Sequence, residues 1–407
     1  MFDATPDATV PPSHATPPVP PYGPPLFKSF FMAGFECSTH RRRDGRRLDM
    51  VAASGHDRFA AADYARCTAL DIHAVRDGVR WHLGERTPGT IRVKHEAARV
   101  RAARDAGVQV VWDLWHYGQP EDLDLLDPSF PRRLARWARA FAELVASETD
   151  DVPLYCPVNE ISFVSWGAGD VAYLDPFRRG KGAHIKRQLA RAAIEASDAV
   201  RSVDPRARLC HVDPVIHVAA APERPHEAEH AAAYTECMFE AWDLIAGAQE
   251  PWLGGSPEYL DVIGVNFYSR NQWVHDGPPI PPESPLYRPL DAILADVWAR
   301  YRRPLFVAET GIEFDGRPAW LAGVGAAVRR ALAAGVPVEG LCWYPIVNHP
   351  GWDDDRHLQC GLWDYADPCG HRPAYEPLLD ELRRQQRLFV TAREELGGGR
   401  VATAAVA

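Results

Sequence analysis

The sequence lacks two features that would connect it with a membrane or a nucleic acid. It contains no run of about 18 consecutive apolar residues, so no segment is expected to span a membrane. Its 45 Lys and Arg residues are outnumbered by 55 Asp and Glu residues, which gives a net charge of -10 at pH 7. Because binding to phosphate backbones needs clustered positive charge, we expect no nucleic-acid partner.

Cysteine pairs with the spacing C-x-x-C are also absent, although the chain has eight cysteines. Cys156, Cys210 and Cys342 lie within apolar runs that are typical of buried strands. We therefore expect buried free thiols in a reducing cytosol rather than a framework of disulfides.

The first 25 residues contain no Lys or Arg, but they hold nine of the 36 prolines. This segment therefore has neither the basic start nor the apolar stretch of a signal peptide. We predict a disordered or polyproline-like tail over 1–25, a flexible C-terminal tail over 397–407, and a cytoplasmic location.

Between residues 26 and 396, short apolar runs alternate with amphipathic stretches, a pattern typical of repeated strand and helix units around a parallel sheet. The expected strands are Phe30–Phe35, Ile72–Trp81, Val108–Trp115, Val152–Val158, Ala207–Val212, Leu260–Phe267, Pro304–Ala308 and Val338–Pro345. The expected helices are Ser54–Leu70, Lys94–Ala106, Arg132–Ser147, Lys186–Val203, Glu227–Ala246, Leu290–Tyr301, Trp320–Ala334 and Glu376–Leu396. This order predicts a single (β/α)8 TIM barrel. An open doubly wound sheet is the alternative, but no Gly-rich phosphate loop follows the first strand.

Two glutamates end expected strands. Glu160 follows the fourth strand and Glu309 follows the seventh, so both carboxylates can reach one pocket at the catalytic end of a barrel. Paired carboxylates are the minimal requirement for glycoside hydrolysis, in which one protonates the leaving oxygen and the other attacks the sugar or activates water. A single strand-end glutamate is more often a loop cap or an ion-pair partner.

Polar and aromatic residues accompany both glutamates at the expected strand ends. They are Arg76 and Trp81, Trp115-His116-Tyr117, Asn159, Asn266-Phe267-Tyr268, and Trp343 with Asn348. This combination strengthens the prediction of a carbohydrate site.

These motifs resemble those of the family-one glycoside hydrolases, the β-glucosidase and β-galactosidase type. The family's N-E-P and T-E-N-G appear as the variants Asn159-Glu160-Ile161 and Ala308-Glu309-Thr310-Gly311. Its D-x-x-G-x-N-Y-Y motif is matched closely by the stretch from Asp261 to Tyr268. Other family segments, R-F-S-x-S-W, H-W-D and W-S-L-x-D-N, correspond to Arg76–Trp81, His116–Gly118 and Trp343–Asn348, in the same order over about 27–380.

The resemblance implies a retaining β-glycosidase with no cofactor and no metal, acting on a small soluble glycoside. It implies that Glu309 is the nucleophile and Glu160 the general acid and base. The implied supporting residues are Arg76 and Tyr268 beside the nucleophile, Asn159 and His116 on sugar hydroxyls, Asn266 in the sixth-strand motif, and Trp343 beneath the sugar ring. A transglycosidase and an inactive carbohydrate-binding barrel remain alternatives.

The sequence departs from the family where the outer hydroxyls of the sugar would be bound. The segment 349–355 lacks the family's glutamate. Asp353 could replace it, or it could belong to a solvated acidic loop, and Trp352 beside it is a further candidate for binding the substrate. The segment after the first strand has the arginines Arg41, Arg42, Arg43, Arg46 and Arg47 near the place of the family's glutamine. These arginines could bind an anionic sugar, or they could form a solvated charge run.

The sequence His226-Glu227-Ala228-Glu229-His230 matches H-E-x-x-H, the signature of zinc proteases. Histidines four residues apart on a helix can share a metal ion, which makes a zinc-dependent hydrolase a further alternative. Pro225 indicates instead the exposed first turn of a helix, in which the two glutamates complement the helix dipole.

Overall fold

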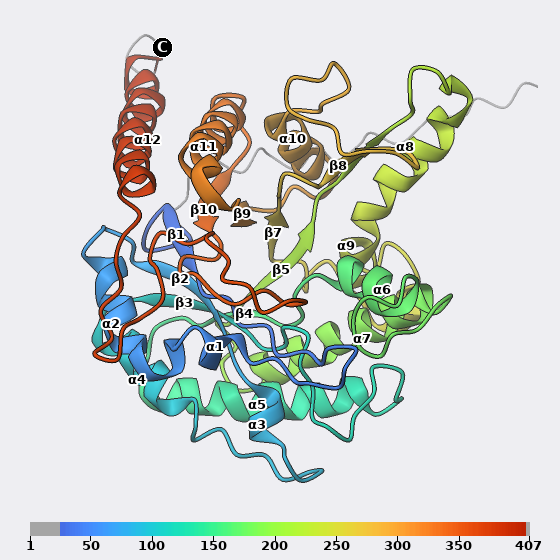
Figure 1. Ribbon diagram of the computed structural model, residues 1–407, viewed down its shortest axis with the longest axis vertical. Helices are drawn as coiled ribbons and strands as arrows, with labels where there is room; N and C mark the ends of the chain where they lie inside the picture. Colours follow the sequence, from blue (N-terminus) through green and yellow to red (C-terminus); the bar gives the residue numbers. More distant parts are fainter. Residues whose placement is uncertain (1–24, 404–407) are drawn as a thin grey trace, which may run out of the picture.

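The computed structural model describes residues 25–403, with side-chain burial described as far as residue 390. Within this range, parallel strands close into a barrel in the order β1-β10-β9-β7-β5-β4-β3-β2 (Figure 1). The barrel strands are β1 (Phe31–Gly34), β2 (Ala74–Gly78), β3 (Gln109–Asp113), β4 (Leu154–Cys156), β5 (Arg208–Pro214), β7 (Val262–Asn266), β9 (Leu305–Thr310) and β10 (Val338–Trp343). This closure confirms the predicted (β/α)8 TIM barrel and excludes the open doubly wound sheet.

Helices surround the barrel on its outside (Figure 1). They are α1 (Met50–Ala53), α2 (His56–Thr68), α3 (Trp81–Gly84), α4 (Ala97–Asp105), α5 (Phe130–Glu148), α6 (Ile161–Gly169), α7 (Gly182–Arg201), α8 (Ala228–Glu236), α9 (Glu240–Ile245), α10 (Leu290–Tyr301), α11 (Arg317–Ala333) and α12 (Glu376–Thr403). The short strands β6 (His217–Ala219) and β8 (Gln272–Val274) pair with each other outside the barrel.

Several boundaries differ from the predicted ones. The single helix expected over Glu227–Ala246 is divided into α8, the 3-10 turn η2 (Cys237–Phe239) and α9. The helix α12 continues to Thr403, so the predicted C-terminal tail over 397–407 is helical for most of its length and otherwise lies outside the described residues. The predicted N-terminal tail over 1–25 also lies outside them, except for its last residue.

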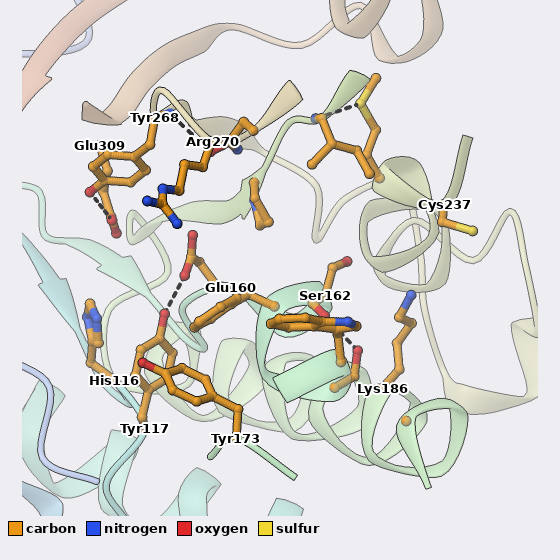
Figure 2. Close-up of a pocket in the computed structure, with 18 of the residues that line it drawn as sticks. His116, Tyr117, Glu160, Ser162, Tyr173, Lys186, Cys237, Tyr268, Arg270 and Glu309 are labelled. Carbon is orange, nitrogen blue, oxygen red and sulfur yellow. Dashed lines mark hydrogen bonds between the residues drawn. The ribbon is translucent and has the colours of Figure 1, made fainter. Parts of the chain in front are cut away.

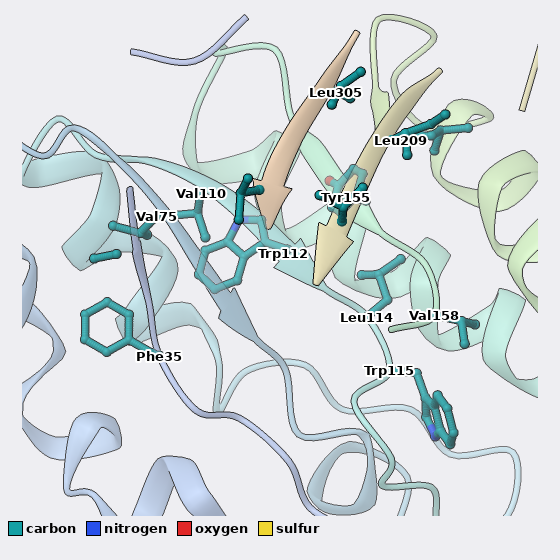
Figure 3. Packing of buried hydrophobic residues seen from close by; sticks show 14 of the residues in the cluster. Phe35, Val75, Val110, Trp112, Leu114, Trp115, Tyr155, Val158, Leu209 and Leu305 are labelled. Atoms are coloured by element: carbon teal, nitrogen blue, oxygen red, sulfur yellow. The ribbon is translucent and has the colours of Figure 1, made fainter. Parts of the chain in front are cut away.

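The strands β7 and β9 are buried on both faces, as their apolar runs predict, and β2 is also fully buried although it contains Arg76 and Asp77. Met32, Val111 and Phe306 belong to one cluster of buried side chains, and a much larger cluster contains residues of both strands and helices. Figure 3 shows part of the larger cluster, including Trp112, Tyr155 and Leu305 on three different barrel strands. The alternation of side chains along each strand divides them between these two clusters.

All eight cysteines lie within the described residues and none is in a disulfide, as predicted. Cys156, Cys210 and Cys342 belong to the smaller cluster and are fully buried. None of the helices in the described part of the chain has the length and apolar character needed to cross a membrane.

Gly264 on β7 shows how closely the barrel strands approach one another. A Cβ atom at this position would lie 2.6 Å from Val212 Cγ2 and 2.9 Å from the Cβ atom of Ala308. We therefore expect Gly264→Ala to lower the free energy of unfolding by about 1–3 kcal/mol, because the rigid strands cannot make room for it.

Gly323 on α11 is the matched control, because an added Cβ would meet nothing within 4 Å. Gly323→Ala should raise stability by up to about 1 kcal/mol, since alanine favours a helix over glycine. Denaturant unfolding of both variants measures the difference, and equal effects would contradict the proposed packing constraint.

Candidate active site

A cavity of about 1330 Å³ lies beyond the carboxyl-terminal ends of the barrel strands. Both predicted carboxylates, Glu160 and Glu309, line it together with His116, Tyr117 and Tyr268 (Figure 2). These side chains come from the ends of four different strands, which is how a parallel barrel assembles a site. The structure therefore brings the two predicted carboxylates to one cavity.

Glu309 lies near the end of β9, where two donors hold its carboxylate. Arg76 donates from Nη1 to Oε1 at 2.9 Å, and the Tyr268 hydroxyl donates to Oε2 at 2.8 Å. Both donors stabilise negative charge on Glu309. The register of β7 against β9 shifts between Val265 and Asn266, which places Asn266 opposite Glu309. Such irregularities often redirect side chains beside active sites.

Arg76 is fully buried on β2 and is the centre of this arrangement. In addition to Glu309, its Nη2 atom donates to Asp113 Oδ2 at 2.7 Å and to Asn159 Oδ1 at 3.1 Å. Burial lowers the pKa of the guanidinium, but the carboxylates of Asp113 and Glu309 raise it well above its usual value. Arg76 therefore remains a cation inside the barrel.

Glu160 has a different environment. Tyr117 and Asn266 donate hydrogen bonds to its two oxygens, and no Lys or Arg within the described residues pairs with it. Burial and the negative charge of Glu309 raise the pKa of Glu160, and the two hydrogen bonds only partly offset this. At neutral pH this environment favours the protonated acid.

The backbone at Glu160 is strained, and hydrogen bonds to β5 and its end hold it in place. Glu160 has a left-handed φ of 51° at the start of α6, a conformation that costs about 1–3 kcal/mol for a residue other than glycine. Its backbone N–H donates to the carbonyl of Val212 at 2.9 Å. Ser162 donates from its backbone N–H at 3.0 Å and from its hydroxyl at 2.6 Å to Asp213. These contacts fix the direction of the Glu160 side chain.

Asn159 and His116 are linked behind the carboxylates. The Nδ2 atom of Asn159 lies 3.3 Å from His116 Nε2 and donates to the Tyr117 hydroxyl at 3.2 Å. Nδ1 of His116 lies 3.0 Å from Asp113 Oδ2. Asn159 is fully buried and is bonded to protein groups on both sides of its amide, whereas His116 lines the cavity.

Trp343 does not lie beneath the cavity, contrary to the role that the resemblance implies. It belongs to the large outer cluster, and its indole N–H donates to the carbonyl of Cys360 at 3.0 Å. Because side chains alternate along a strand, the next residue, Tyr344, faces inward and lines the cavity. Trp352 also lines the cavity, while Asp353 is exposed and lines a separate, smaller hollow.

The arginines after β1 form contacts with other protein groups. Arg41 and Arg47 pair with Glu121, Arg42 and Arg46 pair with Asp355, and Arg43 donates to the carbonyl of Ala172. These contacts fit the solvated charge run better than a site for an anionic sugar.

The H-E-x-x-H segment does not form a metal site in the structure. His226 lies in the 3-10 turn η1 (Pro225–Glu227), His230 lies in α8, and both are exposed. In the described chain, the one group of side chains close enough to share a metal ion is Cys37, Asp113 and His116. Arg76 already donates to Asp113 within this group, and its positive charge opposes a bound cation.

The sequence patterns give no role to four residues of the site, Tyr117, Asp113, Glu36 and Tyr344. Tyr117 lay within the predicted strand-end triplet, but its φ of 69° cannot be read from the sequence. Period-two alternation could have identified Tyr344 in place of Trp343. Glu36 has no motif that marks it.

The fold and the site together define a (β/α)8 barrel with an unlike pair of carboxylates in one cavity. Comparison with solved structures shows similarity to the family 1 β-glucosidase from Thermotoga maritima, with 16% identity and a TM-score of 0.70 over 89% of this chain and 97% of that one. A β-glucosidase from the same organism in complex with glucoimidazole gives 15% identity and a TM-score of 0.71 over 88% and 98%. The AHE enzyme from Alicyclobacillus herbarius gives 16% and 0.69 over 82% and 87%.

At the level of sequence, no protein-family model and no curated protein matches the chain. The structural similarity therefore establishes the fold, which is that of the family 1 β-glucosidases, and leaves the activity to be argued from the site.

The electrostatic link between the two carboxylates can be tested without turnover. Glu309→Gln removes the negative charge that helps to raise the pKa of Glu160, so that pKa should fall towards the ordinary carboxyl range. An NMR titration of 13C-labelled glutamate measures it, with Glu160→Gln identifying the signal. An unchanged pKa in Glu309→Gln would contradict the link.

Proposed function

We propose that the protein is a retaining glycoside hydrolase, a divergent relative of the family 1 β-glucosidases, that acts on a small β-glycoside. The observation that carries the proposal is the unlike environment of the two carboxylates. Arg76 and Tyr268 donate to Glu309, whereas Glu160 has no cationic partner in the described chain and a raised pKa. Unlike environments are what a nucleophile and a general acid require.

In the proposed first step, a Glu309 carboxylate oxygen attacks the anomeric carbon. The bond between that carbon and the leaving oxygen breaks, and the proton of Glu160 passes to the leaving oxygen. The sugar is then joined to Glu309 as an ester. Arg76 and Tyr268 hold the attacking carboxylate in place, which lowers the entropic cost of reaching the transition state.

In the second step, Glu160 acts as a base. Once Glu309 is an ester it carries no charge, so one of the causes that raise the pKa of Glu160 is removed. Glu160 can then take a proton from water, whose oxygen attacks the anomeric carbon and releases the sugar with its original configuration. The same two residues thus serve both halves of the reaction.

The three alternative functions would each require different residues in or near the cavity. An inactive carbohydrate-binding barrel has no use for a strained glutamate with a raised pKa, because such strain is retained chiefly where chemistry requires it. A transglycosidase would use the same two carboxylates with a sugar hydroxyl in place of water. The zinc-dependent hydrolase is not supported, since the two histidines of its motif are exposed.

The kinetic test uses aryl β-glycosides with good and poor leaving groups. Glu309→Gln should lower kcat by at least about 10⁴-fold on both kinds of substrate, because no nucleophile remains. Glu160→Gln should lower kcat/KM, which reports the first step, by about 10²–10⁴-fold with a poor leaving group and much less with a good one, which needs no proton. Glu283→Gln, an exposed glutamate outside the cavity, is the matched control.

NMR of the first product formed gives the stereochemistry. Release of the β-anomer supports the double displacement, whereas the α-anomer would contradict it. Equal rates for wild type and Glu309→Gln would remove Glu309 from the mechanism.

A further inference from the structure

A further carboxylate, that of Glu36, faces the same cavity as Glu160 and Glu309. It follows the end of β1 and is only 7% exposed. The backbone N–H of Ser38 donates to its Oε1 atom at 3.1 Å. Within the described residues, its other oxygen has no hydrogen-bond partner and no Lys or Arg pairs with it. A buried carboxylate with an open oxygen facing a cavity is expected to bind a ligand.

Glu36 is negatively charged under ordinary conditions. Burial raises its pKa, but the imidazoles of His349 and His116 and hydrogen bonds with Ser38 more than offset this, and hold the pKa below its usual value. Glu36 therefore adds a negative charge to that of Glu309, and the imidazole of His116, whose pKa is raised, acts on Glu36 as a positive group.

The charge of His349 acts on the Glu36 carboxylate, and one of the two ring nitrogens of His349 is free to bind a ligand. It is buried, lines the cavity, and its Nδ1 atom lies 2.8 Å from the carbonyl oxygen of Pro350. Because a carbonyl can only accept, Nδ1 carries the proton of that contact. Nε2 has no hydrogen-bond partner within the described residues and can meet a hydroxyl.

The cations that line the cavity come from other elements. Lys186 and Arg187 on α7 pair with Glu240 and Glu250. Arg270 follows β7, and Figure 2 places its side chain in the region between Tyr268 and Glu160. None of them forms an ion pair with Glu36, so the positive groups that act on its charge are the imidazoles of His349 and His116.

We propose that Glu36, together with His349, determines which sugars the site accepts: its carboxylate binds neighbouring hydroxyls of a neutral glycone and excludes sugars that carry a carboxylate or phosphate. This inference rests on the proposed function. An ionised carboxylate accepts hydrogen bonds from two hydroxyls at once, which suits a vicinal diol. A uronate or phosphosugar would place a second negative charge in the same buried space, where repulsion is weakly screened.

The test compares the nitrophenyl β-glucoside with the β-glucuronide and the 6-phospho-β-glucoside, using wild type and Glu36→Gln. For wild type we expect kcat/KM to favour the neutral glycoside by at least about 100-fold. In Glu36→Gln this preference should narrow by about 10-fold or more, because a neutral amide neither repels an anion nor binds hydroxyls as strongly. Glu283→Gln should retain the wild-type preference.

Single-deoxy glucosides provide a second measurement. Removing a hydroxyl that Glu36 contacts should cost wild type about 10- to 100-fold in kcat/KM, and should cost Glu36→Gln much less. Each result is a ratio of the kcat/KM values of two substrates measured on one protein preparation. An unfolded fraction lowers both values equally and therefore does not change the ratio.

The outcomes separate this inference from the proposed function. Turnover of neutral and anionic glycosides with the same preference in wild type and Glu36→Gln would overturn the inference and leave the proposed function standing. A wild type that prefers the anionic glycoside would also overturn it. The absence of turnover of any glycoside by wild type would overturn the proposed function, and the inference with it.

Discussion

One buried cation, the Arg76 guanidinium, is the interaction on which the site depends. It is fully buried and donates to Asp113, Asn159 and Glu309, which come from β3, the end of β4 and β9. Leaving a buried charge without its partners costs about 3–5 kcal/mol, so these groups are held together by the same energetics that keep Arg76 in the barrel. Arg76 thereby fixes the proposed nucleophile relative to the strand ends opposite it.

The charges around Arg76 also explain why Glu160 and Glu309 can differ in protonation state. The Arg76 guanidinium and the Tyr268 hydroxyl donate hydrogen bonds to Glu309. The donors to Glu160, Tyr117 and Asn266, carry no charge. The negative charge of Glu309 then acts on Glu160 across the cavity and raises its pKa. Glu36 adds a further negative charge to the cavity, and this charge is the basis of the proposal that the ligand is neutral and rich in hydroxyls.

The sequence was sufficient to predict the barrel and to predict that Glu160 and Glu309 reach one cavity. Strands buried on both faces leave continuous apolar runs, and a glutamate directly after such a run lies at the catalytic end. Trp343 was assigned to the cavity although alternation places Tyr344 there, and Asp353 was considered although its loop turns it to solvent. Contacts such as that of Tyr117 with Glu160 depend on left-handed backbone at both residues, which tertiary packing imposes and no local pattern indicates.

The central claim is that Glu309 and not Glu160 forms the covalent bond with the sugar. Treatment with a 2-deoxy-2-fluoro β-glucoside that carries a good leaving group tests it most directly, because fluorine at C2 slows both steps and a good leaving group restores only the first. Peptide mass spectrometry should then find the fluorosugar on Glu309, and no adduct should form with Glu309→Gln. An adduct on Glu160, or turnover of the same compound by wild type with inversion and no adduct, would contradict the account.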